Sequence, residues 1–238
     1  MPVDHNKNII ELSDVSFAYT DKNYILEHIN LEVHEGDYLG IIGPNGGGKT
    51  TLLKLIVGLL KPTKGIIHLS SFPIGYVPQK VTNFDMNFPI TVREVVVQGR
   101  VAGRGLFKGF TDEDWKMVEK SLKTVDLLDY QNELIGNLSG GQQQRVFIAR
   151  AIAGQHPHVI FLDEPTTGID ANSQKQFYAF LRKLNREMGM TLILVSHDVD
   201  IITNEVSHVA YVNQKLIYYG DPKFFMQKHY LVHHHPHD

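Results

Sequence analysis

The segment GPNGGGKT at 43–50 combines glycines with a lysine and a following hydroxyl residue. This spacing is typical of a loop that binds the phosphates of a nucleoside triphosphate, because glycines let successive backbone N–H groups point at phosphate oxygens. An apolar strand pattern before it and a helical pattern after it favour this function over a glycine-rich turn with a surface lysine. We expect the lysine to bind the β- and γ-phosphates and the first threonine to bind Mg²⁺. The candidate nucleotide-binding residues are Gly43, Pro44, Asn45, Gly46, Gly47, Gly48, Lys49, Thr50 and Thr51.

Two adjacent carboxylates stand at the end of the apolar run VIFLD at 159–163. A buried strand holds a side chain rigidly at its carboxyl end, where open α/β sheets bind ligands. We expect Asp163 to bind Mg²⁺ and Glu164 to polarise the attacking water. Asp-Glu-Pro is also good turn chemistry, so a simple turn after a strand is the alternative. The phosphate-binding motif earlier in the chain favours the functional interpretation.

The segment LSGGQQQR at 138–145 stands before another helical pattern. Ser139 and Gln142 have the spacing of a capping box, which many ordinary helices share. Gly140 and Gly141 are poor helix formers, so their place in the first turn indicates backbone N–H groups that approach an anion closely. Gly140 and Gly141 are therefore candidates for nucleotide binding, and the family resemblance given next implies the same role for Ser139 and Gln142.

With these three motifs in order, the chain resembles the ATP-binding cassette (ABC) family, whose signature sequence is LSGGQ. The resemblance covers essentially the whole chain and adds four single residues. It implies that Tyr19 stacks on adenine, that Gln79 links Mg²⁺ and water to a helical subdomain, that Asp170 is the aspartate of the D-loop, and that His197 contacts the γ-phosphate. Taken alone, the tyrosine could be a core aromatic of a strand, the glutamine a surface loop residue, and the histidine a helix-start residue after an N-cap serine.

The resemblance also assigns roles within this set of residues. It implies catalytic roles for Lys49, Gln79, Glu164 and His197, and it implies Mg²⁺ ligands in Thr50, Gln79 and Asp163.

The elements that must position these residues follow an α/β pattern, in which short β-branched runs alternate with longer helical patterns. The resemblance implies a P-loop NTPase core with an antiparallel β subdomain and an inserted α-helical subdomain, all in a single ABC ATPase domain at 1–238. We expect the core at 1–80 and 154–225, built from segments distant in sequence, the helical subdomain at 81–153, and a His-rich tail at 226–238. Predicted strands cover 9–19, 31–33, 38–42, 66–69, 74–77, 159–162, 191–195, 206–212 and 216–219, and predicted helices cover 50–60, 91–101, 111–128 and 171–188.

The resemblance further implies cofactors and partners. ATP and Mg²⁺ would bind in a head-to-tail homodimer, in which Ser139 and Gly141 of one copy contact the γ-phosphate held by Lys49 of the other. A polytopic membrane permease would carry the cargo, and an extracytoplasmic metal-binding protein would deliver it. ATP hydrolysis would be coupled to that transport.

The apolar and basic segment 88–110 is predicted to dock on the permease, with a solvated loop as the alternative. Its part 99–110 is rich in glycine and basic residues, which predicts an exposed connection. Charge reversal at Arg100 and Arg104 should then weaken the complex and leave ATP affinity intact.

The cargo is suggested by GYVPQK at 75–80, FPITVREVVVQGR at 88–100 and the His-rich C-terminus. These segments resemble the ATPases of zinc and manganese uptake systems, and the zinc importers in particular. Manganese or iron-chelate uptake is the alternative. A nucleotide-gated scaffold in translation or DNA repair is less favoured, because those relatives usually carry two cassettes, long coiled coils or zinc modules.

Four histidines lie among the last six residues, and neutral imidazole is a good zinc ligand. A flexible tail cannot preorganise a tetrahedral site, so zinc binding there should be weak and pH-dependent. A solvated tail or the remnant of a purification tag is an equal alternative. The candidate zinc ligands are His233, His234, His235 and His237.

Composition excludes several classes of protein. The 23 basic and 26 acidic residues give a net charge of −3, which does not support sequence-independent nucleic-acid binding. The absence of cysteine excludes disulfides, thiolate–zinc sites, iron–sulfur clusters and a cysteine nucleophile. The sequence has no apolar leader and no run long enough to span a membrane. We therefore expect a peripheral protein at the cytoplasmic face of the membrane, held there by the permease.

Overall fold

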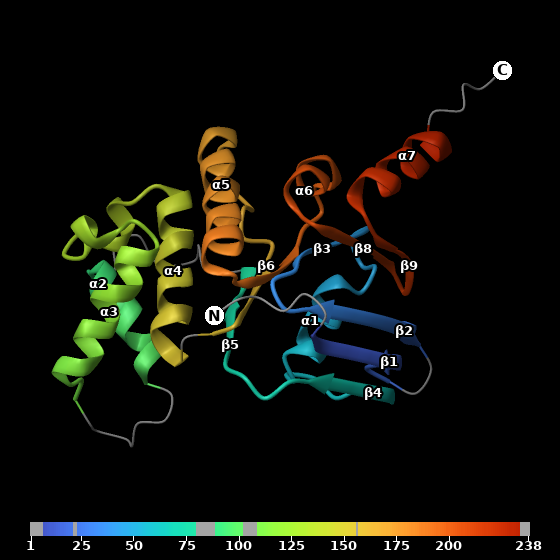
Figure 1. The fold of residues 1–238 in the computed structure, drawn as a ribbon, viewed down its shortest axis with the longest axis horizontal. Helices are drawn as coiled ribbons and strands as arrows, with labels where there is room; N and C mark the ends of the chain where they lie inside the picture. The colour runs from blue at the N-terminus through green and yellow to red at the C-terminus, as the bar shows by residue number, and fades with distance from the viewer. Residues whose placement is uncertain (1–6, 21–22, 80–88, 102–108, 156, 234–238) are drawn as a thin grey trace. The chain divides into compact units, whose positions relative to one another are not determined.

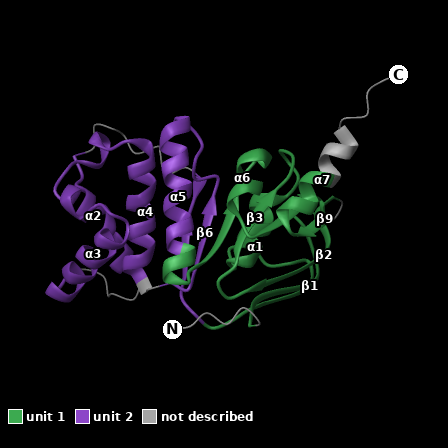
Figure 2. Ribbon diagram, turned by 45° about the horizontal axis from the view of Figure 1, so that its top comes forward, with its two compact units in different colours: residues 1–71, 185–238 green, residues 72–184 purple. Residues whose placement is uncertain are grey.

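A computed structural model describes residues 7–20, 23–79, 89–101, 109–155 and 157–233. The chain divides into two compact units, one formed by 1–71 with 185–238 and the other by 72–184 (Figure 2). We refer to them as the first and the second unit. Among the residues described, no helix is both long and apolar enough to cross a membrane.

The first unit contains an antiparallel sheet of three strands in the order β2-β1-β4 (Figure 1). The strands are β1 (Asn8–Ala18), β2 (Tyr24–His34) and β4 (Lys64–Leu69). Register shifts interrupt the pairing of β1 with both neighbours, and such bulges increase the local twist. The antiparallel β subdomain implied by the family resemblance is present.

The first unit also contains the strand that leads into the phosphate-binding motif. This strand, β3 (Tyr38–Ile42), pairs in parallel with both β7 (Thr191–Val195) and β8 (His208–Asn213), and β9 (Lys215–Gly220) forms a hairpin with β8. All residues of β3 and β7 are buried, as expected for apolar strands inside a parallel sheet. Strands from segments distant in sequence therefore lie side by side in this unit.

Three helices accompany these strands: α1 (Lys49–Ile56), α6 (Val199–Glu205) and α7 (Pro222–His233). Helix α6 approaches β3 so closely that a Cβ atom on Gly40 would lie 2.4 Å from the Cγ2 atom of Ile202. Only glycine fits at that position without a shift of the helix.

The second unit combines α-helices with a pair of parallel strands, β5 (Ile74–Val77) and β6 (Val159–Asp163). The helices are α2 (Val92–Val97), α3 (Asp112–Thr124), α4 (Gly140–Gln155) and α5 (Ala171–Met188), of which α5 ends beyond the boundary at 184. Helix α4 contacts α2, α3 and β5. Capping boxes begin α2 at Thr91 and α3 at Thr111, so both helices start where side chains satisfy the first N–H groups.

Several predicted boundaries are wrong. The helix predicted for 50–60 ends at Ile56, and the one predicted for 111–128 ends at Thr124. Positive φ angles at Gly58 and Asp126 mark these ends, because a residue in the left-handed region stops a helix. The helix predicted for 91–101 continues beyond residue 97 only as a 3₁₀ turn.

Two elements extend beyond what the sequence patterns predict. Strand β2 begins at Tyr24, seven residues before the predicted start at 31, and carries exposed polar residues on its outer face. Helix α7 occupies 222–233, where no helix was predicted. Asp221 accepts a hydrogen bond from the N–H group of Lys223, and Pro222 stands at the first helical position, which is a recognisable start signal.

The predicted exposed connection at 99–110 is wrong at its beginning. A Cβ atom on Gly99 would lie 2.1 Å from the carbonyl oxygen of Arg150 in α4, so this backbone is packed against the helix. The Arg100 Nε atom donates to the Asp114 carboxylate at 2.9 Å, and its Nη1 atom donates to the carbonyls of Ala153 and Gly154. The side chain of Asp114 is fully buried. Residues 102–108, which include Arg104, lie outside the described residues.

Candidate functional site

The phosphate-binding motif forms the loop between β3 and α1 in the first unit. Gly43 has a φ of 147°, and a Cβ atom there would lie 2.0 Å from the backbone oxygen of Val212. Gly48 is the N-cap of α1 with a φ of 94°, and a Cβ atom there would meet the side chain of Leu26. Both positions need glycine, so no side chain covers the backbone of the loop there.

The turn between β8 and β9 is hydrogen-bonded to this loop. The N–H group of Gln214 donates to the carbonyl of Gly47 at 2.9 Å, and the carbonyl of Gln214 accepts from the N–H group of Glu27 in β2. A Cβ atom on Gly47 would lie 2.8 Å from the Val212 carbonyl oxygen. The shape of the loop therefore depends on the β8–β9 hairpin.

Lys49 is the charged residue of this loop and is almost completely buried. Its ammonium group donates to the carbonyls of Gly43 and Pro44, both at 3.0 Å, which places the positive charge inside the curl of the loop. No acidic side chain stands in the first turn of α1, and Gly48 supplies no side-chain cap. A bare loop, a helix N-terminus and an ammonium group together fit a polyphosphate such as that of ATP.

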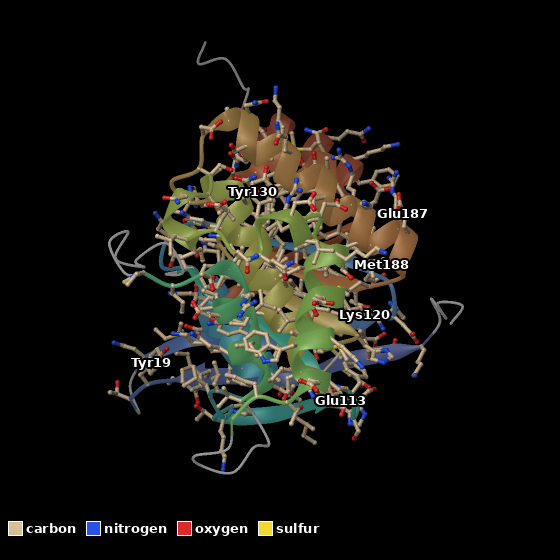
Figure 3. All side chains as sticks on the ribbon, turned by 90° about the vertical axis from the view of Figure 1, so that its left-hand side faces the viewer. Tyr19, Glu113, Lys120, Tyr130, Glu187 and Met188 are labelled. Atoms are coloured by element: carbon tan, nitrogen blue, oxygen red, sulfur yellow. The ribbon has the colours of Figure 1, made fainter. Side chains whose placement is uncertain are left out.

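The first unit also contains His197 and Tyr19. Because β7 pairs in parallel with β3, His197 and the phosphate-binding loop both follow the carboxyl ends of adjacent strands. Its side chain is exposed, and the N-cap of α6 is Asp198, so the alternative of a helix-start residue after an N-cap at Ser196 is wrong. Tyr19, which is labelled in Figure 3, is 61% exposed. The centroid of its ring lies 4.8 Å from that of Phe17, in an edge-to-face arrangement. An aromatic face exposed in this way suits stacking on a base.

The second unit contains the two carboxylates at the end of β6. Asp163 is almost completely buried, and Glu164 is half-buried with a φ of 45°. Because β5 pairs in parallel with β6, Gln79 beyond β5 lies beside Glu164, and its Nε2 atom donates to the carboxylate Oε2 atom at 2.7 Å. The structure therefore brings these two predicted residues together.

Tyr76, which no sequence motif indicated, lies on β5 opposite Phe161 of β6. Burial raises the pKa of Tyr76, and so does the Asp163 carboxylate, which accepts a hydrogen bond from the phenol. Its place three residues before Gln79 carries no chemical signal in the sequence. Asp163 offers carboxylate oxygens, the ligand type that Mg²⁺ prefers.

The signature segment begins α4, where the capping box predicted as the alternative is present. The N–H group of Ser139 donates to Gln142 Oε1 at 2.9 Å, and the N–H group of Gln142 donates to the Ser139 hydroxyl at 3.4 Å. Added Cβ atoms at Gly140 and Gly141 would lie 3.2 Å from Ile169 and 3.3 Å from the Ser173 carbonyl oxygen. Tight packing therefore explains the glycines as well as anion binding does.

A polar cavity of about 260 Å³ adjoins the signature segment. Burial lowers the pKa of Arg145 in its wall, and the nearby Asp126 carboxylate opposes that shift. The residues that line the cavity are Asp126, Leu127, Tyr130, Ser139, Gly141, Gln142, Arg145, Ser173, Gln176 and Phe177.

Asp170 caps α5 by accepting hydrogen bonds from the N–H groups of Asn172 and Ser173. Its bonds to Ser173 are the main reason that the pKa of Asp170 lies below its usual value.

Of the four candidate zinc ligands at the C-terminus, the structure describes only His233. His233 is the last residue of α7, and His234, His235 and His237 lie outside the described residues. Within the described part of the chain, no three histidine or acidic residues gather as a metal site.

Comparison with known proteins identifies related chains. Residues 26–167 match the family described as ABC transporter. The zinc uptake system ATP-binding protein ZurA of Listeria monocytogenes is 44% identical over 235 residues, which cover 95% of this chain and 90% of that protein. The manganese transport system ATP-binding protein MntB of Halalkalibacterium halodurans is 39% identical over 219 residues, which cover 89% and 86%.

Solved structures agree with the fold. The structure of cbiO1 from Clostridium perfringens, part of the ABC transporter complex cbiONQ, has a TM-score of 0.82 and 28% identity, and the match covers 94% of this chain and 93% of that one. A bacterial ABC transporter cassette solved as a dimer has a TM-score of 0.71 and 30% identity, with 90% and 98% covered.

Proposed function

This chain belongs to the ABC transporter family, and on that premise we propose that it is the ATP-hydrolysing subunit of an importer that takes up zinc. The contact between Gln79 and Glu164, beside the buried Asp163, is the observation that carries the hydrolytic role. A carboxylate held next to a second, metal-binding carboxylate is the arrangement that water activation at a nucleotide requires. The fold of an ABC-type ATPase supports the same conclusion.

We infer the following roles for the phosphate-binding residues. Lys49 and the backbone N–H groups of residues 43–51, except Pro44, which has none, bind the β- and γ-phosphates. Thr50, Gln79 and Asp163 hold Mg²⁺, which when bound neutralises phosphate charge. Glu164 orients the attacking water and accepts its proton.

The remaining predicted residues complete the nucleotide site. Tyr19 stacks on adenine and His197 contacts the γ-phosphate. Ser139, Gly140, Gly141 and Gln142 belong to a head-to-tail homodimer, in which they and Asp170 act on the ATP of the second copy. The cavity lined by the signature residues and the dimeric form of a solved relative support this assignment.

Zinc is the proposed cargo because ZurA, a zinc uptake protein, matches nearly the full chain. Manganese is the second candidate, because MntB matches almost as much of the chain at slightly lower identity. The subunit would act at the cytoplasmic face of the membrane through a polytopic permease, supplied by an extracytoplasmic metal-binding protein. Within the predicted dock at 88–110, the exposed side chains of Val101 and Phe110 are the candidate contacts.

Reconstitution tests this function. The chain is purified in complex with its permease and placed in liposomes with ATP and Mg²⁺, and the uptake of radioactive zinc, manganese and an iron chelate is compared. We expect ATP-dependent zinc uptake above that of the other two, and none in a matched complex that carries Glu164→Gln. Preferred uptake of manganese or of the iron chelate would overturn the cargo, and hydrolysis without any uptake would favour a scaffold.

We also propose that the C-terminal histidines form a weak zinc site that senses imported zinc. Deleting the chain from His233 onward should abolish zinc binding and relieve any zinc inhibition of ATP hydrolysis, because the imidazole ligands are lost. Isothermal titration with zinc measures the first effect and ATPase assays the second. Identical zinc titrations of the full-length and shortened chains would refute the site and leave the ATPase assignment intact.

A further inference from the structure

We propose that Thr167 is a positioning residue of the ATPase site, whose hydroxyl group holds the carboxylate of Glu164 in the orientation that a general base needs. This role rests on the proposed function of Glu164. Thr167 acts through that carboxylate and is not itself a catalytic residue.

The backbone after β6 folds Thr167 back onto Glu164. The N–H group of Thr167 donates to the carbonyl of Glu164 at 3.3 Å, which closes a four-residue turn. Pro165 occupies the second position of this turn, where its fixed φ angle is favourable. The turn chemistry read from Asp-Glu-Pro is therefore present, and it serves to bring the Thr167 hydroxyl to within 3.3 Å of the Glu164 Oε2 atom.

Two donors converge on that one carboxylate oxygen. Gln79 Nε2 donates to Oε2 at 2.7 Å from a segment distant in sequence, and Thr167 Oγ1 donates to the same atom from within the turn. Donors on one oxygen limit rotation of the carboxylate, and a fixed orientation is what catalysis gains from such bonds. The turn ties Thr167 to Glu164 within one short segment, so this contact does not depend on Gln79.

The neighbouring threonine has a different role. The hydroxyl group of Thr166 bonds with the Tyr178 hydroxyl at 3.2 Å and accepts from the Gln174 Nε2 atom at 3.2 Å, both on α5. These contacts stabilise the packing of the loop on that helix. Thr166 is therefore a matched control: it has the same side chain as Thr167, but its hydrogen bonds go to residues of α5 and not to the Glu164 carboxylate.

Three variants of the full chain separate positioning from packing. Thr167→Val keeps the shape of the side chain but removes the donor, and we expect kcat to fall about three- to tenfold, the effect of one hydrogen bond, with KM for ATP and the melting temperature unchanged. Thr167→Ser should restore most of kcat. Thr166→Val should lower the melting temperature and leave kcat per folded protein unchanged. A kcat for Thr167→Val within about twofold of the parent, or a Thr167→Ser variant that is equally impaired, would overturn the proposal.

A double variant shows whether Thr167 acts through Glu164. In a Glu164→Gln background, Thr167→Val should cause no further loss of turnover, because the base it positions is already gone. A further loss of the same size as in the parent would overturn the role. If Glu164→Gln by itself retains full turnover, then the proposed base is wrong, which is a separate failure.

Discussion

Replacing Glu164 by glutamine is expected to cut ATP turnover by roughly two to four orders of magnitude, because a general base is lost while the size of the side chain is kept. Gln79 can still contact the glutamine side chain, so the local structure around this position should persist. ATP binding should be retained, since the phosphate-binding residues are unchanged. Without turnover, the closed homodimer should accumulate in ATP and Mg²⁺.

Steady-state hydrolysis, nucleotide binding and size-exclusion chromatography with ATP measure the three effects. Glu187→Gln, a neutralisation of the same kind on the exposed end of α5, serves as the control and should leave turnover unchanged (Figure 3). Undiminished hydrolysis by Glu164→Gln would assign the base to another residue.

Replacing Arg100 by glutamate should destabilise the protein by about 3–5 kcal/mol, because the fully buried Asp114 would lose its cation and face a second carboxylate. Asp114 also accepts two bonds from Thr111 at 2.7 Å, so the start of α3 should weaken as well. Chemical denaturation followed by circular dichroism measures the loss. These contacts are incompatible with the prediction that charge reversal at Arg100 weakens only the permease complex.

The exposed ion pair of Lys183 with Asp126, at 3.1 Å, is the matched control. Lys183→Glu should cost at most about 1 kcal/mol, because solvent screens that pair. Equal losses for the two variants would mean that the burial of Asp114 does not determine the stability of this region.

Sequence patterns predicted the elements whose ends carry a strong local signal. The helix at 171–188 and the strand at 191–195 have the predicted bounds, because helical periodicity gives way abruptly to an apolar run. Strand β2 was predicted short because its first half mixes charged and apolar residues. Its pairing with β1 shows that these residues continue the strand, with buried and exposed positions alternating. Two helix ends were predicted too late, and a residue with positive φ follows each true end, Gly58 in one case and Asp126 in the other.

The candidate site shows the same division. Motifs with fixed spacing, such as the phosphate-binding loop, were found because the chemistry resides in neighbouring residues. Tyr76 was missed because only the register of β5 with β6 brings it to Asp163. Thr167 was missed because the turn expected after Asp-Glu-Pro does not show which hydroxyl group reaches the Glu164 carboxylate. Arg100 was misassigned because a basic residue among glycines gives no sign of a buried carboxylate fourteen residues later.

The bond between Gly47 and Gln214 has a consequence for how the protein is made. The loop lies in the first quarter of the chain, yet its walls include the Val212 carbonyl and the turn after β8. During synthesis, the ribosome releases residues 43–50 long before the β8–β9 hairpin that completes them. The loop can therefore take its final form only after nearly the whole chain has emerged. A product truncated before β8 would contain the complete motif in its sequence but would lack the native shape of the loop.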